Sequence, residues 1–200
     1  MEQSQLETTA GGRAKRWVSE ARFRGRVARM GVVPAVASTA ATMQALVQHG
    51  MCTNAAERWL REPTSSVSQR DQLLAEVYEH LVDCPSPETE WQAVREVLDD
   101  DELLARLVGV HPVSVRRYAK AERRCSDAVA ARLHWLALVV DQLEGTYNAY
   151  GIRRWFQRPR AALGNASPQD RLTGEWDPDD PAIREVAALA EAALSGMVAS

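Results

Sequence analysis

The sequence lacks the patterns of a disulfide framework, a membrane span and a secretory signal. Its three cysteines, Cys52, Cys84 and Cys125, lie far apart and form no Cys-x-x-Cys pair, so we expect free thiols in a reducing cytoplasm. No stretch approaches the roughly 20 apolar residues of a membrane helix. The basic N-terminus lacks the apolar segment of a secretory signal. These absences favour a cytoplasmic protein with no membrane partner.

The sequence also lacks the patterns of an enzyme. No Gly-rich phosphate loop is present, and no nucleophile is paired with a base. The acidic runs 99–102 and 177–180 each precede an expected helix, where carboxylates cap the helix and face its positive end. Neither run has the spacing of a calcium-binding loop. We therefore expect no catalytic residue, no metal and no cofactor. The four histidines are scattered: His49, His80, His111 and His134.

Strand patterns are missing as well. There is no sustained alternation of apolar and polar residues, and no Asn-Gly or Asp-Gly hairpin turn. Apolar residues recur instead at helical spacing, in segments that end at glycine or proline. The pattern predicts an all-α protein. We expect a helical region of unknown role over 34–87, a second helical domain over 88–145 and a third over 146–200.

Charge is unevenly distributed along the chain. The net charge of −3 gives no overall attraction for nucleic acid, so such binding requires a local basic patch. Residues 11–30 and 111–132 are basic, whereas 71–102 and the segment after 172 are acidic. We expect a basic flexible arm over 1–33 with a short helix around 15–29. That arm either binds phosphates or is a solvated tail.

Residues 101–120 have the pattern of a helix-turn-helix. Ala105 is small enough for a second helix to cross close by, and Gly109 tolerates the positive φ of the turn. Pro112 suits the first turn of the second helix. The outward face of that helix and the residues after it are then candidates for contacts with base edges and phosphates. The predicted DNA-binding residues are Val113, Ser114, Arg116, Arg117, Lys120, Arg123 and Arg124.

An apolar helix predicted over 126–144 leads into a stretch rich in aromatic residues and arginine. It reads Gly-Thr-Tyr-Asn-x-Tyr-Gly-Ile-Arg-Arg-Trp-Phe-x-Arg-Pro-Arg-x-x-Leu over 145–163, then Ser-Pro-x-x-x-Leu over 167–172. On composition alone it is a compact hydrophobic anchor or a binding surface. Its position decides between them. Behind a helix-turn-helix and before an acidic amphipathic helix, it is typical of the folded centre of a partner-binding domain.

Over residues 98–198 this order resembles the antitoxins of the Xre/MbcA/ParS type, as found in RES–Xre toxin–antitoxin pairs. The resemblance implies an Xre-like helix-turn-helix domain over 88–145 and a toxin-binding domain over 146–200. It also implies a homodimer that is not itself an enzyme. Such a protein neutralises a partner toxin with a NAD-consuming RES domain and represses its own operon by binding operator DNA. The implied partner-binding residues are Trp155, Phe156, Arg158, Pro159, Leu163, Pro168 and Leu172.

Residues 1–90 have no counterpart in this resemblance. They leave a second interpretation open, namely a stand-alone transcription regulator without a toxin. In that case the N-terminal half serves dimerisation or signal reception.

Overall fold

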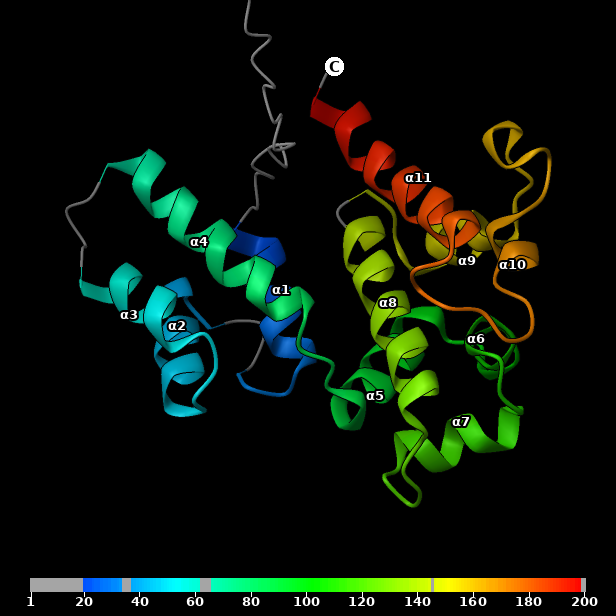
Figure 1. Ribbon diagram of the computed structural model, residues 1–200, viewed down its shortest axis with the longest axis horizontal. Helices are drawn as coiled ribbons and strands as arrows, with labels where there is room; N and C mark the ends of the chain where they lie inside the picture. The colour runs from blue at the N-terminus through cyan, green and yellow to red at the C-terminus, as the bar shows by residue number, and fades with distance from the viewer. Residues whose placement is uncertain (1–19, 34–36, 62–65, 145, 199–200) are drawn as a thin grey trace, which may run out of the picture.

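The computed structural model describes residues 20–33, 37–61, 66–144 and 146–198 (Figure 1). Within these ranges the regular structure is helical throughout, and no strand occurs. The predicted all-α fold class is therefore confirmed for the described part of the chain.

The N-terminal unit is made of four helices: α1 (Glu20–Arg29), α2 (Thr39–Gln48), α3 (Thr53–Arg61) and α4 (Val67–Val82). Ser38 caps α2 by accepting a hydrogen bond from the backbone N–H of Ala41. Ser66 and Gln69 form a reciprocal capping box at the start of α4. The four helices enclose a core of their own, which is centred on Phe23, Met43, Trp59, Val77 and Leu81.

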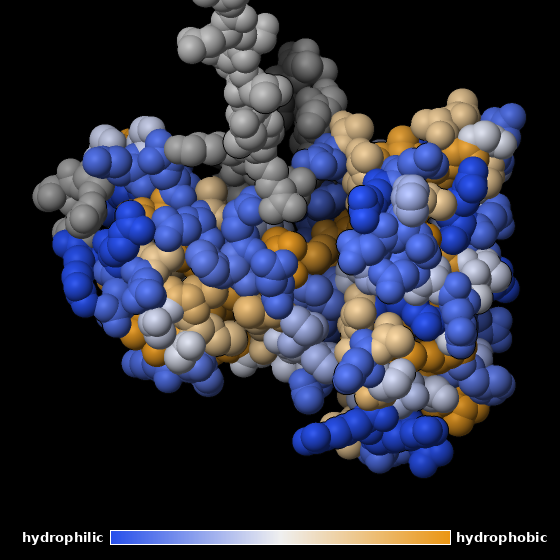
Figure 2. Space-filling view, in the orientation of Figure 1, coloured by the Kyte–Doolittle hydropathy of each residue, from blue (hydrophilic) through white to orange (hydrophobic). Residues whose placement is uncertain are grey.

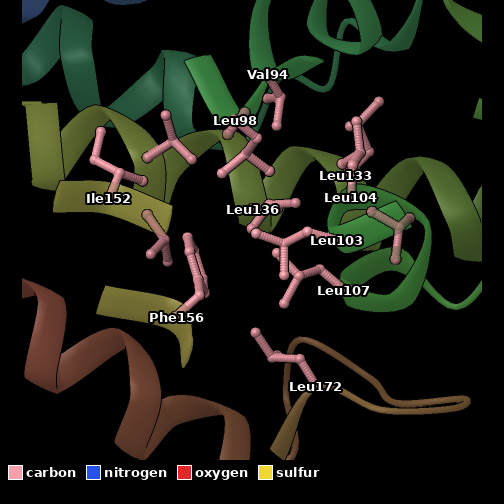
Figure 3. Packing of buried hydrophobic residues seen from close by; sticks show 14 of the residues in the cluster. Val94, Leu98, Leu103, Leu104, Leu107, Leu133, Leu136, Ile152, Phe156 and Leu172 are labelled. Carbon is pink, nitrogen blue, oxygen red and sulfur yellow. The ribbon is translucent and has the colours of Figure 1, made fainter. Parts of the chain in front are cut away.

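The C-terminal unit contains the remaining helices. They are α5 (Pro87–Leu98), α6 (Asp101–Val108), α7 (Pro112–Ala119), α8 (Asp127–Glu144), α9 (Ala149–Gln157), η1 (Ala161–Leu163), α10 (Pro168–Arg171) and α11 (Pro181–Val198). Their apolar faces share one continuous core around α8. Figure 3 shows side chains from α5, α6, α8 and α9 converging there, with Leu172 closing the core from the segment after α10. The two domains predicted over 88–145 and 146–200 therefore have a common core.

The short helix expected around 15–29 of the basic segment 1–33 is present over residues 20–29. Residues 20–29 form α1, whose Phe23 and Val27 are fully buried in the N-terminal core. Of the two arginines between them, Arg26 is buried against Glu90 of the other unit, and Arg24 donates to the carbonyl oxygen of Ala37 at 3.4 Å. Residues 1–19 lie outside the described part of the chain. Residues 20–29 do not form a flexible arm, because one face of this helix packs in the apolar core and another face meets acidic residues.

Helix α1 joins the two units through a buried charged cluster. Arg26 is completely buried and donates from Nη2 to Oε1 of Glu90, also completely buried, at 2.8 Å. The Nδ1 atom of His134 lies 2.8 Å from the same carboxylate oxygen, and its Nε2 lies 2.6 Å from the carbonyl oxygen of Val82. Hydrogen bonds from both residues hold the pKa of Glu90 below its usual range, against the opposing effect of burial. His134 is thus a packed histidine at the junction of the two units.

A second pair lies one helical turn further along α1. Arg29 contacts the buried carboxylate of Asp141, and its Nη1 donates to Glu144 at 2.5 Å. Burial raises the pKa of Asp141 to about 6, although Arg29 and Arg26 favour its charged form. Charged groups from both units therefore meet at the junction, although an apolar contact would avoid the desolvation cost of buried charges.

Asp141 predicts a specific pH dependence of stability. Its folded pKa of about 6 exceeds the usual unfolded value of about 3.9, so its contribution to stability is fully present below the unfolded pKa and is lost as pH rises through 6. For a shift of roughly two units this amounts to at most about 3 kcal/mol. We expect the free energy of unfolding of Asp141→Asn to lack the fall that the parent protein should show between pH 4 and pH 7. Urea titrations at both pH values measure it. An identical fall in both proteins would contradict the assignment.

Candidate nucleic-acid interface

Helices α6 and α7 begin and end with local signals. Asp100 caps α6 by accepting hydrogen bonds from the backbone N–H groups of Glu102 at 3.0 Å and Leu103 at 2.9 Å. The Nδ1 atom of His111 accepts from the N–H of Val113 at 3.2 Å and so caps α7. Pro112 occupies the first turn of α7, as expected. The predicted pair of short helices on either side of Gly109 is present.

The turn between the two helices requires glycine for two reasons. Gly109 has φ of +72°, in the left-handed region. A Cβ atom there would also lie 2.4 Å from the carbonyl oxygen of Gly174 and 2.6 Å from Nη1 of Arg132. The segment after α10 therefore packs directly against the turn. Trp176 completes this contact by donating from its indole N–H to the carbonyl oxygen of Leu107 at 2.9 Å.

The inner faces of α6 and α7 pack as predicted. Ala105 is buried at the crossing, and Val108 and Val115 are fully buried. Tyr118 is 8% exposed and stacks on Trp91 of α5 with a centroid distance of 5.1 Å. With its inner face committed to the core, α7 has a fixed outer face.

That outer face carries the predicted DNA-binding residues. Val113 is 54% exposed, Arg117 and Lys120 are exposed, and Ser114 is half-buried. Arg123 and Arg124 are exposed in the loop after α7. Figure 2 shows strongly hydrophilic side chains gathered over this end of the C-terminal unit. Four cations have no acidic partner within the described residues: Arg117, Lys120, Arg123 and Arg124.

Arg116 differs from its neighbours. Its Nε lies 3.0 Å from Oδ2 of Asp101, and Oδ1 of the same carboxylate accepts a hydrogen bond from Nε of Arg95 at 2.6 Å. These two arginines, Arg95 above all, lower the pKa of Asp101. Arg116 remains 60% exposed at its side chain. It is oriented by an acid of α6, so it contributes less free charge to the surface than the sequence suggested.

The predicted partner-binding residues divide into two groups. Arg158 and Pro159 are exposed, but the other residues are buried: Trp155, Phe156, Leu163, Pro168 and Leu172. Trp155 meets Phe156 edge to face at 5.1 Å, and the guanidinium of Arg160 lies 5.6 Å from the Trp155 ring centre. The core leaves these five residues almost no accessible surface, and their direct contact with a partner stays a prediction. They hold the domain together.

The arginines around this motif have separate roles. Arg153 donates to the carbonyl oxygen of Leu98 at 2.9 Å and so ties α9 to the end of α5. Arg154 and Arg158 are exposed and have no ion pair with the described residues. Tyr150 is 65% exposed on the same helix. These three residues, together with Pro159, form the surface that remains for a partner, which we call the α9 surface.

Three structural contacts were not predicted. Trp176 and Arg132 secure the C-terminal end of α6, and Trp91 supports α7 from behind. Trp176 follows a glycine in an acidic loop, so no helical periodicity marks it as a core residue. Within the described residues no group of His, Cys, Asp or Glu side chains is arranged to hold a metal ion. None of the described helices is both long and apolar enough to cross a membrane.

The chain has no match among protein-family models, curated proteins or solved structures.

The close packing around Gly109 predicts that Gly109→Ala strongly lowers the stability of the protein. Gly109→Ala introduces both an unfavourable φ, at about 1–2 kcal/mol, and a Cβ that collides with backbone. Gly50→Ala is a matched control, since Gly50 has φ of +70° and open space around the new Cβ. We expect thermal denaturation to show a distinctly lower melting temperature for Gly109→Ala than for Gly50→Ala. Equal melting temperatures would contradict the packing of Gly174 against the turn.

Trp155 predicts an effect on stability. Trp155→Ala removes a side chain that is 3% exposed and should lower the free energy of unfolding by about 3–5 kcal/mol. Tyr150→Ala, on the exposed side of the same helix, should change it little. Chemical denaturation of both variants measures the difference. A stable Trp155→Ala variant would mean that the ring is available to a partner.

Proposed function

We propose that this protein is a DNA-binding antitoxin that neutralises a partner toxin and represses its own operon. The observation that carries the proposal is the exposed basic surface of α7 and its following loop, whose Arg117, Lys120, Arg123 and Arg124 lack acidic partners within the described residues. In a chain of net charge −3, such a surface is a local attraction for phosphate. The fixed inner face of α7 gives it the rigidity that groove recognition needs.

The positions of these residues favour base contacts from α7 and phosphate contacts from the loop that follows it. Val113 and Arg117 lie on α7, where an inserted helix meets base edges, and arginine can donate two hydrogen bonds to guanine. Arg123 and Arg124 lie beyond the helix end, where phosphates of the flanking backbone are in reach. We infer that α7 enters the major groove of operator DNA. Two copies would read two half-sites, as the expected homodimer requires.

The antitoxin part of the proposal rests on the α9 surface. Tyrosine and arginine are enriched among residues that dominate binding energy at protein interfaces. Helices α7 and α9 adjoin opposite ends of α8, whose 18 residues extend about 27 Å (Figure 1). A toxin on the α9 surface would therefore leave α7 free for DNA. The resemblance of 145–172 to Xre/MbcA/ParS antitoxins names the class of partner, a RES-domain toxin.

The alternative is a stand-alone regulator whose N-terminal unit receives a signal or mediates dimerisation. The buried charged junction favours it, because α1–α4 are fixed to α5 and α8 by ion pairs that a simple antitoxin would not need. Co-expression separates the two. If the product of the adjacent gene is toxic alone and harmless together with this protein, the antitoxin function holds. If that product is harmless alone, the regulator is the better account.

DNA binding predicts a defined mutational pattern. Arg117→Ala and Lys120→Ala should each weaken affinity for the protein's own promoter by about tenfold or more, and should reduce the salt dependence by about one ion per variant. Both side chains are exposed, so the melting temperature should not change. Arg158→Ala, an equally exposed arginine on α9, is the control. Fluorescence anisotropy across a salt series measures it. Unchanged affinity in both α7 variants would remove α7 from the interface.

A further inference from the structure

The outer face of α7 includes an arginine that is paired with an acid. Val113, Arg116, Arg117 and Lys120 recur at helical spacing and share one stripe of α7, away from the buried Val115. Arg117 and Lys120 have no acidic partner within the described residues, whereas Arg116 is paired with a carboxylate of α6. The proposed function does not use this pair. A paired arginine in a stripe of unpaired cations needs a separate explanation.

The pair belongs to a chain of three side chains, one from each of α5, α6 and α7. Asp101 is the first residue of α6, and its side chain is 19% exposed. Arg95 of α5 donates from Nε to Oδ1 of Asp101 at 2.6 Å and from Nη2 to Oδ2 at 3.4 Å. The Nε atom of Arg116 lies 3.0 Å from the same Oδ2. Arg95 therefore fixes the carboxylate, and the fixed carboxylate orients Arg116.

The contact with Asp101 leaves the far end of the Arg116 guanidinium accessible. It uses Nε, so Nη1 and Nη2 remain, and Arg116 has no other ion pair or hydrogen bond to the part of the chain that the structure describes. Two such donors in one plane match the O6 and N7 acceptors of guanine in the major groove. Because the side chain is already oriented, it loses less conformational freedom when it binds.

The carboxylate makes Arg116 poorly suited to general phosphate binding. Asp101 and Glu102 lie in the first turn of α6, and Asp99 and Asp100 come just before it. Carboxylates repel the phosphates of any DNA, so this part of the surface lowers affinity for every sequence. An oriented arginine restores affinity only where a base offers the matching acceptors. A loss on all sequences and a gain on one make binding selective.

We propose that Arg116 reads a guanine in the major groove and that Asp101 is the positioning residue that orients it. The inference rests on the proposed DNA-binding function of α7 and adds the base that this helix recognises. Arg95 completes the arrangement by holding Asp101 from α5. Asp101 thereby lowers the affinity for DNA in general and raises the preference for operator DNA.

Fluorescence anisotropy of the full-length protein tests Asp101, with its own promoter duplex and a scrambled duplex of the same base composition. Asp101→Asn is compared with Glu102→Gln, because Glu102 is an exposed acid of the same turn without an ion pair to the described residues. Each variant removes one negative charge, so both should bind the scrambled duplex more tightly and to the same degree. We expect Asp101→Asn to lower the preference for the promoter at least about fivefold, and Glu102→Gln to retain it.

Two results of this comparison would overturn the proposal. The first is an equal preference for the promoter in Asp101→Asn and Glu102→Gln, because the charge alone would then explain the effect. The second is a greater preference in Asp101→Asn than in the parent protein, because Asp101 would then compete with DNA for Arg116.

A second variant tests the guanine and does not depend on the folding of Asp101→Asn. Arg116→Lys keeps the charge at an exposed position but loses the planar fork, so it should lower the preference for the promoter about fivefold or more. Replacing each guanine of the promoter by 7-deazaguanine removes the N7 acceptor, and there the parent and Arg116→Lys should bind equally well. An Arg116→Lys variant with the parent's preference would overturn the assignment. So would a parent preference that 7-deazaguanine leaves unchanged.

The parent protein separates this inference from the proposed function. If the parent binds the promoter no more tightly than the scrambled duplex, operator recognition by α7 and the inference fail together. If the parent prefers the promoter but Asp101→Asn and Glu102→Gln behave alike, only the roles of Asp101 and Arg116 fail.

Discussion

Helix α8 is surrounded by other helices, and its packing is the constraint on which the rest of the structure depends. Its apolar stripe of Leu133, Leu136, Val140 and Leu143 completes the core shared by α5, α6, α9 and α11. A second stripe carries His134 and Asp141, two turns apart on one side, and these face the arginines of α1. Helix α8 thus packs on α5, α6, α9 and α11 through apolar side chains and on α1 through charged side chains.

These two modes of contact have different energetic consequences. Removing apolar surface from water stabilises a core in proportion to the area buried. Buried ion pairs contribute little net stability, since desolvation offsets the attraction, but breaking one leaves an uncompensated charge. The raised pKa of Asp141 is the sign of this cost. The orientation of the N-terminal unit is therefore specified by charge pairing, while the fold of the C-terminal unit is specified by its apolar core.

The same packing determines which surfaces are left for function. Tyr118 and Val115 bind α7 to the core, and the segment around Gly174 and Trp176 fixes the turn before it. The exposed basic side chains of α7 therefore extend from a rigid support. At the other end of α8, burial of Trp155 and Phe156 fixes α9 and leaves Tyr150, Arg154 and Arg158 outside. Two exposed surfaces at opposite ends of one helix fit the proposal that DNA and a protein partner bind at the same time.

Local signals explain what the sequence could predict. Serine and aspartate caps, Pro112 and Gly109 mark helix ends within a few residues, and helical spacing marks the core. The buried arginines of α1 could not be found this way, because Arg26 and Arg29 meet acids 64 and 115 positions away. An arginine in a basic segment looks exposed until its partner is known. Likewise, helical spacing could not show how deeply the aromatic motif at 155–172 is buried, because its burial depends on packing against distant helices.

The central claim is that α7 and its following loop form the DNA-binding surface. The most direct test is an NMR titration of the ¹⁵N-labelled protein with a duplex from its own promoter. The account predicts that the largest amide shifts occur over residues 113–124, with those of α9 unchanged. Shifts confined to other surfaces, or no shifts at all, would contradict it.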